Sequence, residues 1–446
     1  RLAVFPGGTD ITGVEYLFSD LGALDVLDAL VLSGFVNVGP REELAGEMWV
    51  SMSAAVVAYL RPKISSGARD EATRRLGERL MMLCVRLGEA QEADQCLAAV
   101  HERAIQTVLD ADPPTVQRTH LALARANGSL RRAPSQRHDA YRGLLSVADE
   151  VRPDLMPSWL ALRALTASGE TEATESVDAA LAYRDAPMPA EERISLVLAV
   201  ENVLTRLGRP RESFELLRDT AVADSGSEGK AARPLTRLWE RYSWRCLELG
   251  TANEQLQAAT RAVRLAKRLD DPVRLCRSWF LLGIAQARTE QSEAAIDSFR
   301  RAIEVGIPGH LQTGNARANL GQYLCELGRM DEGLPLLRAV ADQVGPIWNL
   351  KAKATTLLAL IPHVGPDEAR ERLVVVERLM KAEVMRSVAP LVSAEWAILE
   401  HVARPGEARC HLARALELAA EQGLDAASQL MKRVAVAQEL LDGVKA

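Results

Sequence analysis

The pair Gly229-Lys230 is the nearest approach in this sequence to a phosphate-binding loop. Such a loop needs the pattern G-x-x-x-x-G-K-[ST], because its backbone amides surround the phosphates and its hydroxyl group holds magnesium. Here Ala231 follows the lysine, and Asp224 stands where the first glycine is required. We therefore expect that this chain does not hydrolyse nucleotides by itself.

The sequence also contains no complete motif for a catalytic metal site or for a catalytic nucleophile. His101-Glu102 begins the zinc-protease pattern H-E-x-x-H, but Ile105 stands where the second histidine is needed. His401 and His411 are the one close pair of histidines, and Cys410 points about 100° away from His411 on a helix. No G-x-S-x-G elbow occurs. We expect no catalytic residue, metal site or cofactor in this chain, although an enzyme whose catalytic residues meet only on folding stays open.

Composition favours a long helical array without a nucleic-acid or membrane partner. The 446 residues are too many for one compact core, and hydrophobic residues make up 48% while aromatics make up 4%. The net charge of -6 comes from 54 basic and 60 acidic residues mixed along the chain. Such a chain has no basic field to attract phosphates or acidic lipids. Without an apolar run of about eighteen residues or a signal peptide, a cytoplasmic protein is expected.

The cysteines show no C-x-x-C spacing and lie in apolar helical stretches, where a small buried thiol fits. All six are therefore expected to be structural: Cys84, Cys96, Cys246, Cys276, Cys325 and Cys410.

A glycine that ends one helix and opens a turn recurs about every forty residues. Glycine can take the left-handed conformation that closes a helix without strain at Cβ. The regularity predicts a solenoid of helix, turn and helix units. The pairs are Leu87-Gly88, Asn127-Gly128, Ser168-Gly169, Leu207-Gly208, Leu249-Gly250 and Leu327-Gly328, with Glu290 where a further glycine is expected.

Two stretches are expected to interrupt the helices. Pro113-Pro114, within Asp110 to Thr115, cannot continue a helix because both residues lack the backbone donor. The polar, glycine-rich stretch from Asp224 to Pro234 is expected to be a loop between repeats.

The clearest repeat runs from Arg277 to Gly306. It carries Trp279, Leu282 and Gly283 on its first helix and Ala295, Phe299 and Ala302 on its second. These residues resemble the tetratricopeptide repeat, which has a large residue, Leu-Gly, and then small, aromatic and small residues at these offsets. Equivalent positions one repeat earlier and later are Trp239, Ala259, Ala262, Leu320, Gly321 and Leu337. A repeat near forty residues exceeds the ordinary length of roughly 34, as in large bacterial regulator arrays.

The first sixty residues lack this pattern. An apolar helix from Leu24, the turn Ser33-Gly34, a strand at Phe35 to Val38, a polar turn from Gly39 to Glu47 and a strand at Met48 to Met52 follow in order. This layout and the amino-acid sequence itself resemble the winged-helix module that follows the nucleotide-binding unit in STAND-type, NB-ARC-like signalling ATPases. The resemblance rests on residues 1–8, 23–31 and 34–36.

In the STAND family, tetratricopeptide repeats commonly follow the winged-helix module. The family's characteristic histidine is missing from Ser51-Met52-Ser53-Ala54, so direct nucleotide contact is not expected. A winged helix can also bind DNA, but the helix that would enter the groove carries Asp25 and Asp28 and no Lys or Arg between Ala23 and Gly34.

The sequence thus predicts an all-α fold with strands confined to the first sixty residues. A winged-helix module at 1–62 would precede tandem repeats of about forty residues at 63–445, stacked as antiparallel helix pairs into a right-handed superhelix. Because the chain begins with Arg1 and not with Met, a missing N-terminal portion is expected.

In tetratricopeptide arrays the first helices line the concave face, which suits a peptide or a docked domain. The family's inward positions fall on Arg237, Trp244, Arg277, Phe280, Asn315 and Gln322, with Ala318 between the last two. A solvated face or helix packing is the plainer interpretation of each. A donor, an aromatic and amides recurring on one face are the mixture found at binding hot spots.

Two functions follow from these expectations. The first is the sensor arm of a STAND-type regulator, which binds a protein, peptide or small effector and controls its own N-terminal ATPase domain. The second is a stand-alone tetratricopeptide scaffold or peptide receptor, with the first sixty residues as a cap.

Overall fold

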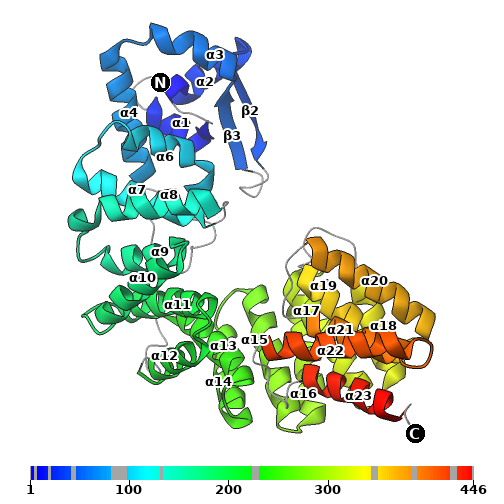
Figure 1. Cartoon of the computed structure of the whole chain (residues 1–446). Coiled ribbons are helices and arrows are strands. Elements are labelled where there is room, and N and C mark those ends of the chain that lie inside the picture. The colour runs from blue at the N-terminus through cyan, green and yellow to red at the C-terminus, as the bar shows by residue number, and fades with distance from the viewer. Residues whose placement is uncertain are drawn as a thin grey trace. The chain divides into compact units, whose positions relative to one another are not determined.

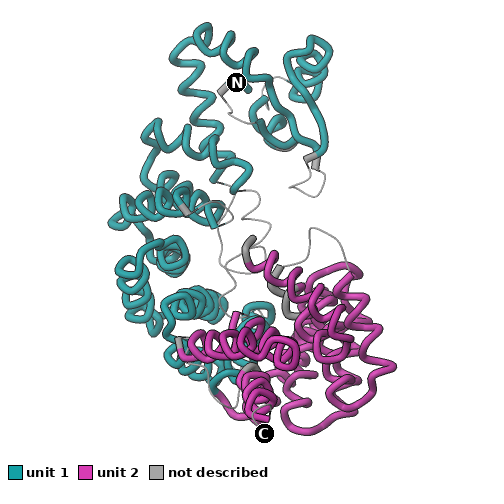
Figure 2. The backbone as a smooth tube through the Cα atoms, turned by 45° about the vertical axis from the view of Figure 1, so that its right-hand side comes forward, with its two compact units in different colours: residues 1–249 teal, residues 250–446 magenta. Residues whose placement is uncertain are grey.

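The computed structural model describes residues 2–4, 8–18, 22–41, 47–81, 98–130, 134–223, 231–342, 350–382, 389–421 and 429–443. Within these ranges the chain is helical apart from one small sheet near the N-terminus (Figure 1). It divides into two compact units, Arg1–Leu249 and Gly250–Ala446 (Figure 2).

The described strands all lie in the first sixty residues, as expected. They are β1 (Thr9–Asp10), β2 (Val36–Arg41) and β3 (Glu47–Met52), in the antiparallel order β1-β3-β2, with Val38 opposite Val50. Around them lie the helices α1 (Ile11–Leu17), α2 (Ala23–Leu32) and α3 (Ala54–Leu60). The two expected strands are present, although β2 runs on to Arg41. The two-residue β1 was not expected.

The other α-helices described in the first unit follow the module. They are α4 (Ser66–Met81), α6 (Glu102–Leu109), α7 (Thr115–Ser129), α8 (Pro134–Ser146), α9 (Met156–Thr166), α10 (Glu170–Tyr183), α11 (Ala190–Arg206), α12 (Pro210–Ala223) and α13 (Ala232–Glu248). The break at Pro113-Pro114 falls between α6 and α7, as expected. The loop predicted from Asp224 to Pro234 needs correction, because α13 already begins at Ala232; residues 224–230 lie outside the described residues.

The second unit continues the helix pairs. It holds α14 (Ala252–Ala266), α15 (Pro272–Arg288), α16 (Ser292–Val305), α17 (Leu311–Glu326), α18 (Met330–Ala341), α19 (Leu350–Leu360), α20 (Pro366–Ala382), α21 (Ala389–Glu400), α22 (Pro405–Glu421) and α23 (Gln429–Gly443). The first helices α15, α17, α19 and α21 begin about forty residues apart. The prediction of an all-α, tetratricopeptide-like repeat fold is confirmed.

Local sequence explains where these helices begin. Thr251 caps α14 by accepting a hydrogen bond from the Glu254 amide, and the Glu254 carboxylate accepts one from the Thr251 amide. Asp271 caps α15 through the Arg274 amide, with Pro272 at the first helical position.

Three helices end in the same left-handed turn. Gly208, Glu290 and Gly328 have φ angles of +69°, +60° and +79°. In each turn the next amide donates to the carbonyl five residues back, as at Arg209 to Leu204, Gln291 to Gln286 and Arg329 to Leu324. Glu290 therefore occupies the conformation predicted for a glycine.

Three other glycines of the forty-residue series do not take the left-handed conformation, and Gly250 is one of them. Gly169 caps α10 in an extended conformation, with φ of -95°. Gly128 lies inside α7, where an added Cβ would come within 2.7 Å of the Ala99 amide nitrogen. At these positions the expected left-handed turn was wrong. Gly88 lies outside the described residues.

Small residues let the helices of the clearest repeat approach closely. A Cβ at Gly283 of α15 would lie 2.7 Å from the ring of Phe299 on α16. One repeat later, a Cβ at Gly321 of α17 would lie 2.9 Å from Leu337 on α18. Ala295 and Ala302 are fully buried in the same core. The tetratricopeptide resemblance thus rests on real contacts in two adjacent repeats.

The cysteines agree only in part with the expectation. Cys246, Cys276 and Cys325 are buried, whereas Cys410 is exposed on α22, so the prediction for Cys410 was wrong. Cys84 and Cys96 lie outside the described residues. Among the described helices none is long and apolar enough to span a membrane.

Candidate functional site

The six predicted binding residues lie on the first helices of their repeats. Arg237 and Trp244 are on α13 in the first unit. Arg237 is half-buried, and Trp244 exposes 36% of its surface, which is unusual for the largest side chain.

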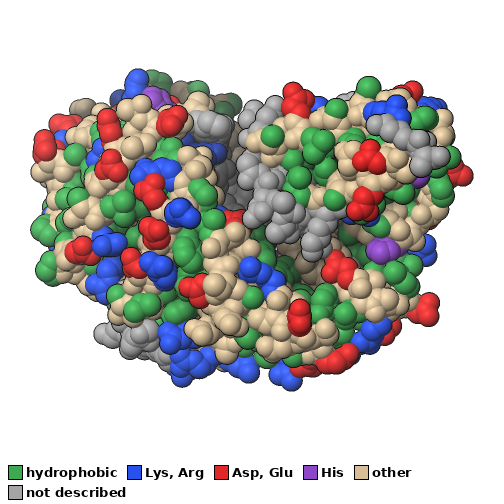
Figure 3. Space-filling view, turned by 60° about the horizontal axis from the view of Figure 1, so that its bottom comes forward, with side chains coloured by type: hydrophobic (Ala, Val, Ile, Leu, Met, Phe, Trp, Pro, Cys, Tyr) green, Lys and Arg blue, Asp and Glu red, His purple; other side chains and the backbone are tan. Residues whose placement is uncertain are grey.

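On the face that Figure 3 shows, the acidic and basic side chains of the described residues are interspersed, as the mixed composition suggests.

The other four residues lie in the second unit, on the contacting helices α15 and α17. Arg277, Asn315 and Gln322 are half-buried, and Gln322 donates a hydrogen bond to Glu326 over 3.0 Å. Phe280 is different. Only 7% of it is exposed, and its ring lies 6.2 Å from that of Phe299 in the hydrophobic core. Phe280 therefore packs the repeat and offers little surface to a ligand.

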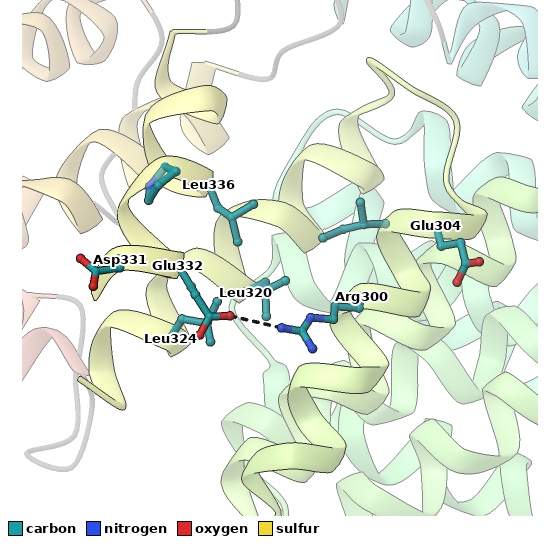
Figure 4. Close-up of a pocket in the computed structure, with 9 residues that line it drawn as sticks. Arg300, Glu304, Leu320, Leu324, Asp331, Glu332 and Leu336 are labelled. Carbon is teal, nitrogen blue, oxygen red and sulfur yellow. Dashed lines mark hydrogen bonds and ion pairs between the residues drawn. The ribbon is translucent and has the colours of Figure 1, made fainter. Parts of the chain in front are cut away.

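A groove of about 490 Å³ opens between the second helices α16 and α18, with α17 at its floor (Figure 4). Its apolar lining consists of Ile303, Leu320, Leu324, Pro335 and Leu336. Its charged lining consists of Arg300, Glu304, Asp331 and Glu332. Pockets that hold small ligands have volumes of roughly 300–1,000 Å³, so the groove has room for large side chains.

One ion pair crosses this groove. Arg300 of α16 reaches Glu332 of α18 over 3.3 Å (Figure 4). Arg329 also donates to Glu332, at 2.7 and 3.0 Å, and these hydrogen bonds hold the pKa of Glu332 below its ordinary value. Glu332 is therefore an ionised carboxylate that is paired with two arginines.

A second hollow, of about 560 Å³, lies along α20 and is lined by Asp367, Arg370, Glu371, Val374, Val375 and Arg378. All of these residues come from one helix, and Arg370 is paired with Glu400 at 2.9 Å. The hollow offers a shallow surface, whereas the groove between α16 and α18 has walls on two sides.

Buried ion pairs brace the helices and were not visible in the sequence. In the first unit, Arg245 donates to Glu201 at 3.0 and 3.2 Å, and 6% and 1% of these residues are exposed. Burial disfavours the charge, yet Glu248 and Glu201 hold the pKa of Arg245 above its usual value. In the second unit, Arg433 forms two bonds of 2.6 and 2.7 Å with Glu395.

Two histidines of the incomplete metal motifs pack against aromatic rings. Among the described residues no group of three or more His, Cys, Asp and Glu is placed to hold a metal ion. His101 is buried with its ring 5.2 Å from that of Trp49, and His411 stacks on Trp396. Gly229-Lys230 lies outside the described residues.

No protein-family model matches the sequence, and no curated protein matches it. Solved structures do match. The apo form of RapI has a TM-score of 0.58 and 11% identity, and the match covers 79% of this chain and 99% of that chain. A STAND protein with a tetratricopeptide repeat sensor from Pyrococcus horikoshii has a TM-score of 0.58 and 14% identity, over 99% of this chain and 64% of that chain.

A Rap protein complexed with Competence and Sporulation Factor has a TM-score of 0.50 and 12% identity, over 81% of this chain and 99% of that chain. At such low identities the likeness shows the fold. The chain is a tetratricopeptide-like helical repeat protein that spans 64% of the length of the STAND protein it matches.

Proposed function

We propose that this chain is the partner-sensing arm of a STAND-type regulator. Its repeats bind a protein, peptide or small effector along their first helices. Residues 1–62 act as a winged-helix module that relays binding to a nucleotide-binding domain on its N-terminal side. The observation that carries the proposal is the likeness to a STAND protein with a tetratricopeptide sensor, which runs over 99% of this chain and so includes both the module and the repeats.

Exposed apolar side chains on the module support this arrangement. Helix α2 is strongly apolar, yet Leu27 is its one buried residue. Exposed large hydrophobics of residues 22–60 are Leu24, Val31, Leu32, Phe35, Met48 and Tyr59, with Leu32 88% exposed. Exposed apolar side chains are what a contact with another domain would cover.

The junction between module and repeats supports a relay. Asp10 accepts hydrogen bonds from the Gly13 amide at 2.9 Å and from Arg79 of α4 at 3.0 Å. Tyr16 of α1 donates to Glu78 of α4 over 2.9 Å. These contacts join α1 to the first long helix after the module, so a displacement of one would be felt by the other.

A stand-alone peptide receptor is the second candidate. It is favoured by the matches to RapI and to the Rap protein complexed with Competence and Sporulation Factor, each of which is covered over 99% of its length. The complete reading frame separates the two candidates. If the residues preceding Arg1 contain no Walker-type loop, the STAND arrangement is wrong and the receptor remains.

The first-helix surface can be tested with a peptide selected from a display library on the intact chain. For a peptide that binds the second unit we expect Arg277→Ala and Gln322→Ala each to weaken binding by about 1 kcal/mol or more, because hot spots concentrate in such side chains. For a peptide that binds the first unit we expect the same of Trp244→Ala. The melting temperature should hardly change. Calorimetric titration measures the affinity, and unchanged affinity in all three variants would place the site elsewhere.

Core variants provide the control. Leu282→Ala or Phe299→Ala should lower the free energy of unfolding by roughly 2–5 kcal/mol, because each leaves a cavity. They should affect binding only where the protein unfolds.

A further inference from the structure

The groove between α16 and α18 holds two carboxylates without partners. Glu304 on α16 and Asp331 on α18 are exposed, and neither forms an ion pair or a side-chain hydrogen bond with another described residue. Glu332, by contrast, is neutralised by Arg300 and Arg329. The groove therefore carries net negative charge that the second unit does not itself neutralise.

The floor of the groove is fixed by close packing beneath it. A Cβ at Gly321 would lie 3.0 Å from the Gly333 carbonyl, and a Cβ at Gly333 would lie 2.5 Å from Cys325 Sγ. Helices α17 and α18 therefore touch through small residues. Leu320 and Leu324 are buried at the bottom, and the half-buried Ile303 and Leu336 form the walls.

Pro335, which also lines the groove, interrupts the backbone hydrogen bonds of α18. It lies inside α18 and has no amide hydrogen, so it cannot donate to the carbonyl of Asp331 one turn earlier. That carbonyl therefore lacks its usual donor within the helix.

We propose that the groove binds a segment of a protein partner in which large aliphatic side chains are flanked by lysine or arginine. The aliphatic side chains would enter between Ile303 and Leu336, and the cations would meet Glu304 and Asp331. An acidic segment would be repelled, because both unpaired charges are negative. The Arg300–Glu332 pair is half-exposed on both sides and so contributes little, which lets an entering segment displace it.

This site deepens the partner-sensing function proposed above by adding a contact on the second helices. It does not depend on the first-helix surface, and the two can fail separately.

The test uses the whole chain with ¹³C-labelled Ile and Leu methyl groups. The probes are acetyl-Gly-Lys-Leu-Leu-Lys-Gly-amide and its counterpart with Glu in place of Lys. We expect the Lys peptide, at up to millimolar concentration, to shift the methyl signals of Ile303, Leu324 and Leu336. The Glu peptide should bind at least about fivefold more weakly, since an exposed charge pair changes affinity by about two- to fivefold.

Charge reversal makes the test specific. Glu304→Lys combined with Asp331→Lys should invert the preference, so that the Glu peptide binds more tightly than the Lys peptide. The matched control is Glu175→Lys combined with Glu215→Lys, two exposed acids on the second helices α10 and α12. It makes the same change in net charge and should leave the preference intact.

Several outcomes would overturn the proposal: no shift of the groove methyls, equal binding of both peptides, or a preference that survives the reversal. Equal binding with groove shifts would indicate a purely apolar site. If Arg277→Ala and Gln322→Ala abolish peptide binding while the reversal does not, the probe occupies the first-helix surface; the groove proposal then fails and the proposed function stands.

Discussion

Glu290 adopts a left-handed backbone conformation, with φ of +60°, in a turn where two other repeats have Gly208 and Gly328. A residue with a Cβ loses roughly 1–2 kcal/mol there, while glycine loses roughly 0.5–1 kcal/mol more conformational freedom on folding. We expect Glu290→Gly to raise the free energy of unfolding by about 0.5–1 kcal/mol. Urea denaturation of the purified chain measures the change.

The control for this variant is Glu175→Gly, an exposed position in the middle of α10. Glycine there should lower stability by about 0.5–1 kcal/mol. Equal destabilisation by both variants would show that the turn at Glu290 is not strained.

Gly283 lets α15 pack closely against α16. Because an added Cβ would lie 2.7 Å from the Phe299 ring, Gly283→Ala must shift the ring or the helix. We expect a loss of about 1–3 kcal/mol in thermal unfolding, and a similar loss when Ala295 or Ala302 becomes a bulky residue. Gly169→Ala, with nothing within 4 Å of the added Cβ, should cost less than about 1 kcal/mol, because an N-cap prefers glycine to alanine. A neutral Gly283→Ala would contradict the assigned repeat register.

At the scale of elements, the buried pair of Glu201 and Arg245 joins α11 to α13. Glu201→Ala would leave the buried Arg245 guanidinium with Glu248 as its remaining carboxylate partner, so we expect a loss of up to about 3–5 kcal/mol in the free energy of unfolding. Replacing both residues by Met should restore much of it. The exposed pair of Glu417 and Arg414 is the comparison, and Glu417→Ala should cost less than about 1 kcal/mol. Equal losses in chemical denaturation would mean that burial adds nothing to the pair.

The helices themselves could be predicted because their signals are local. Leu-Gly at the end of α11 and α17, and Pro113-Pro114 between α6 and α7, act through neighbouring backbone atoms. Gly128 and Gly169 misled the prediction because glycine serves several purposes. At Gly128 it permits a close approach to Ala99, and that requirement is set by a distant segment.

At the scale of the molecule, repeats should respond to damage locally, because each contacts its neighbours. We expect Ala302→Leu to speed amide hydrogen exchange in α15 to α17 and to leave α9 to α11 of the other unit unchanged. Exchange followed by mass spectrometry resolves these helices. A uniform change over both units would indicate that the chain unfolds as one cooperative body.

The candidate site was predictable only where one helix defines it. Arg277, Asn315 and Gln322 lie partly exposed on first helices, but helical spacing could not tell that Phe280 would be covered by Phe299. Side chains of α16 and α18 line the same groove because α17 lies between the two helices and holds them at a fixed distance. Pro335, a proline in a helical pattern, was its one local signal.

The first helices of this array are longer than those expected in an ordinary tetratricopeptide repeat. Helices α13 and α15 each have 17 residues and are therefore about 25 Å long. Relative to a repeat of roughly 34 residues, each helix gains nearly one turn, or about 5 Å. An extended chain advances about 3.3 Å per residue. A peptide lying along these helices would thus be contacted over one or two more residues in every layer, and the array would distinguish its ligands by length as well as by side chain.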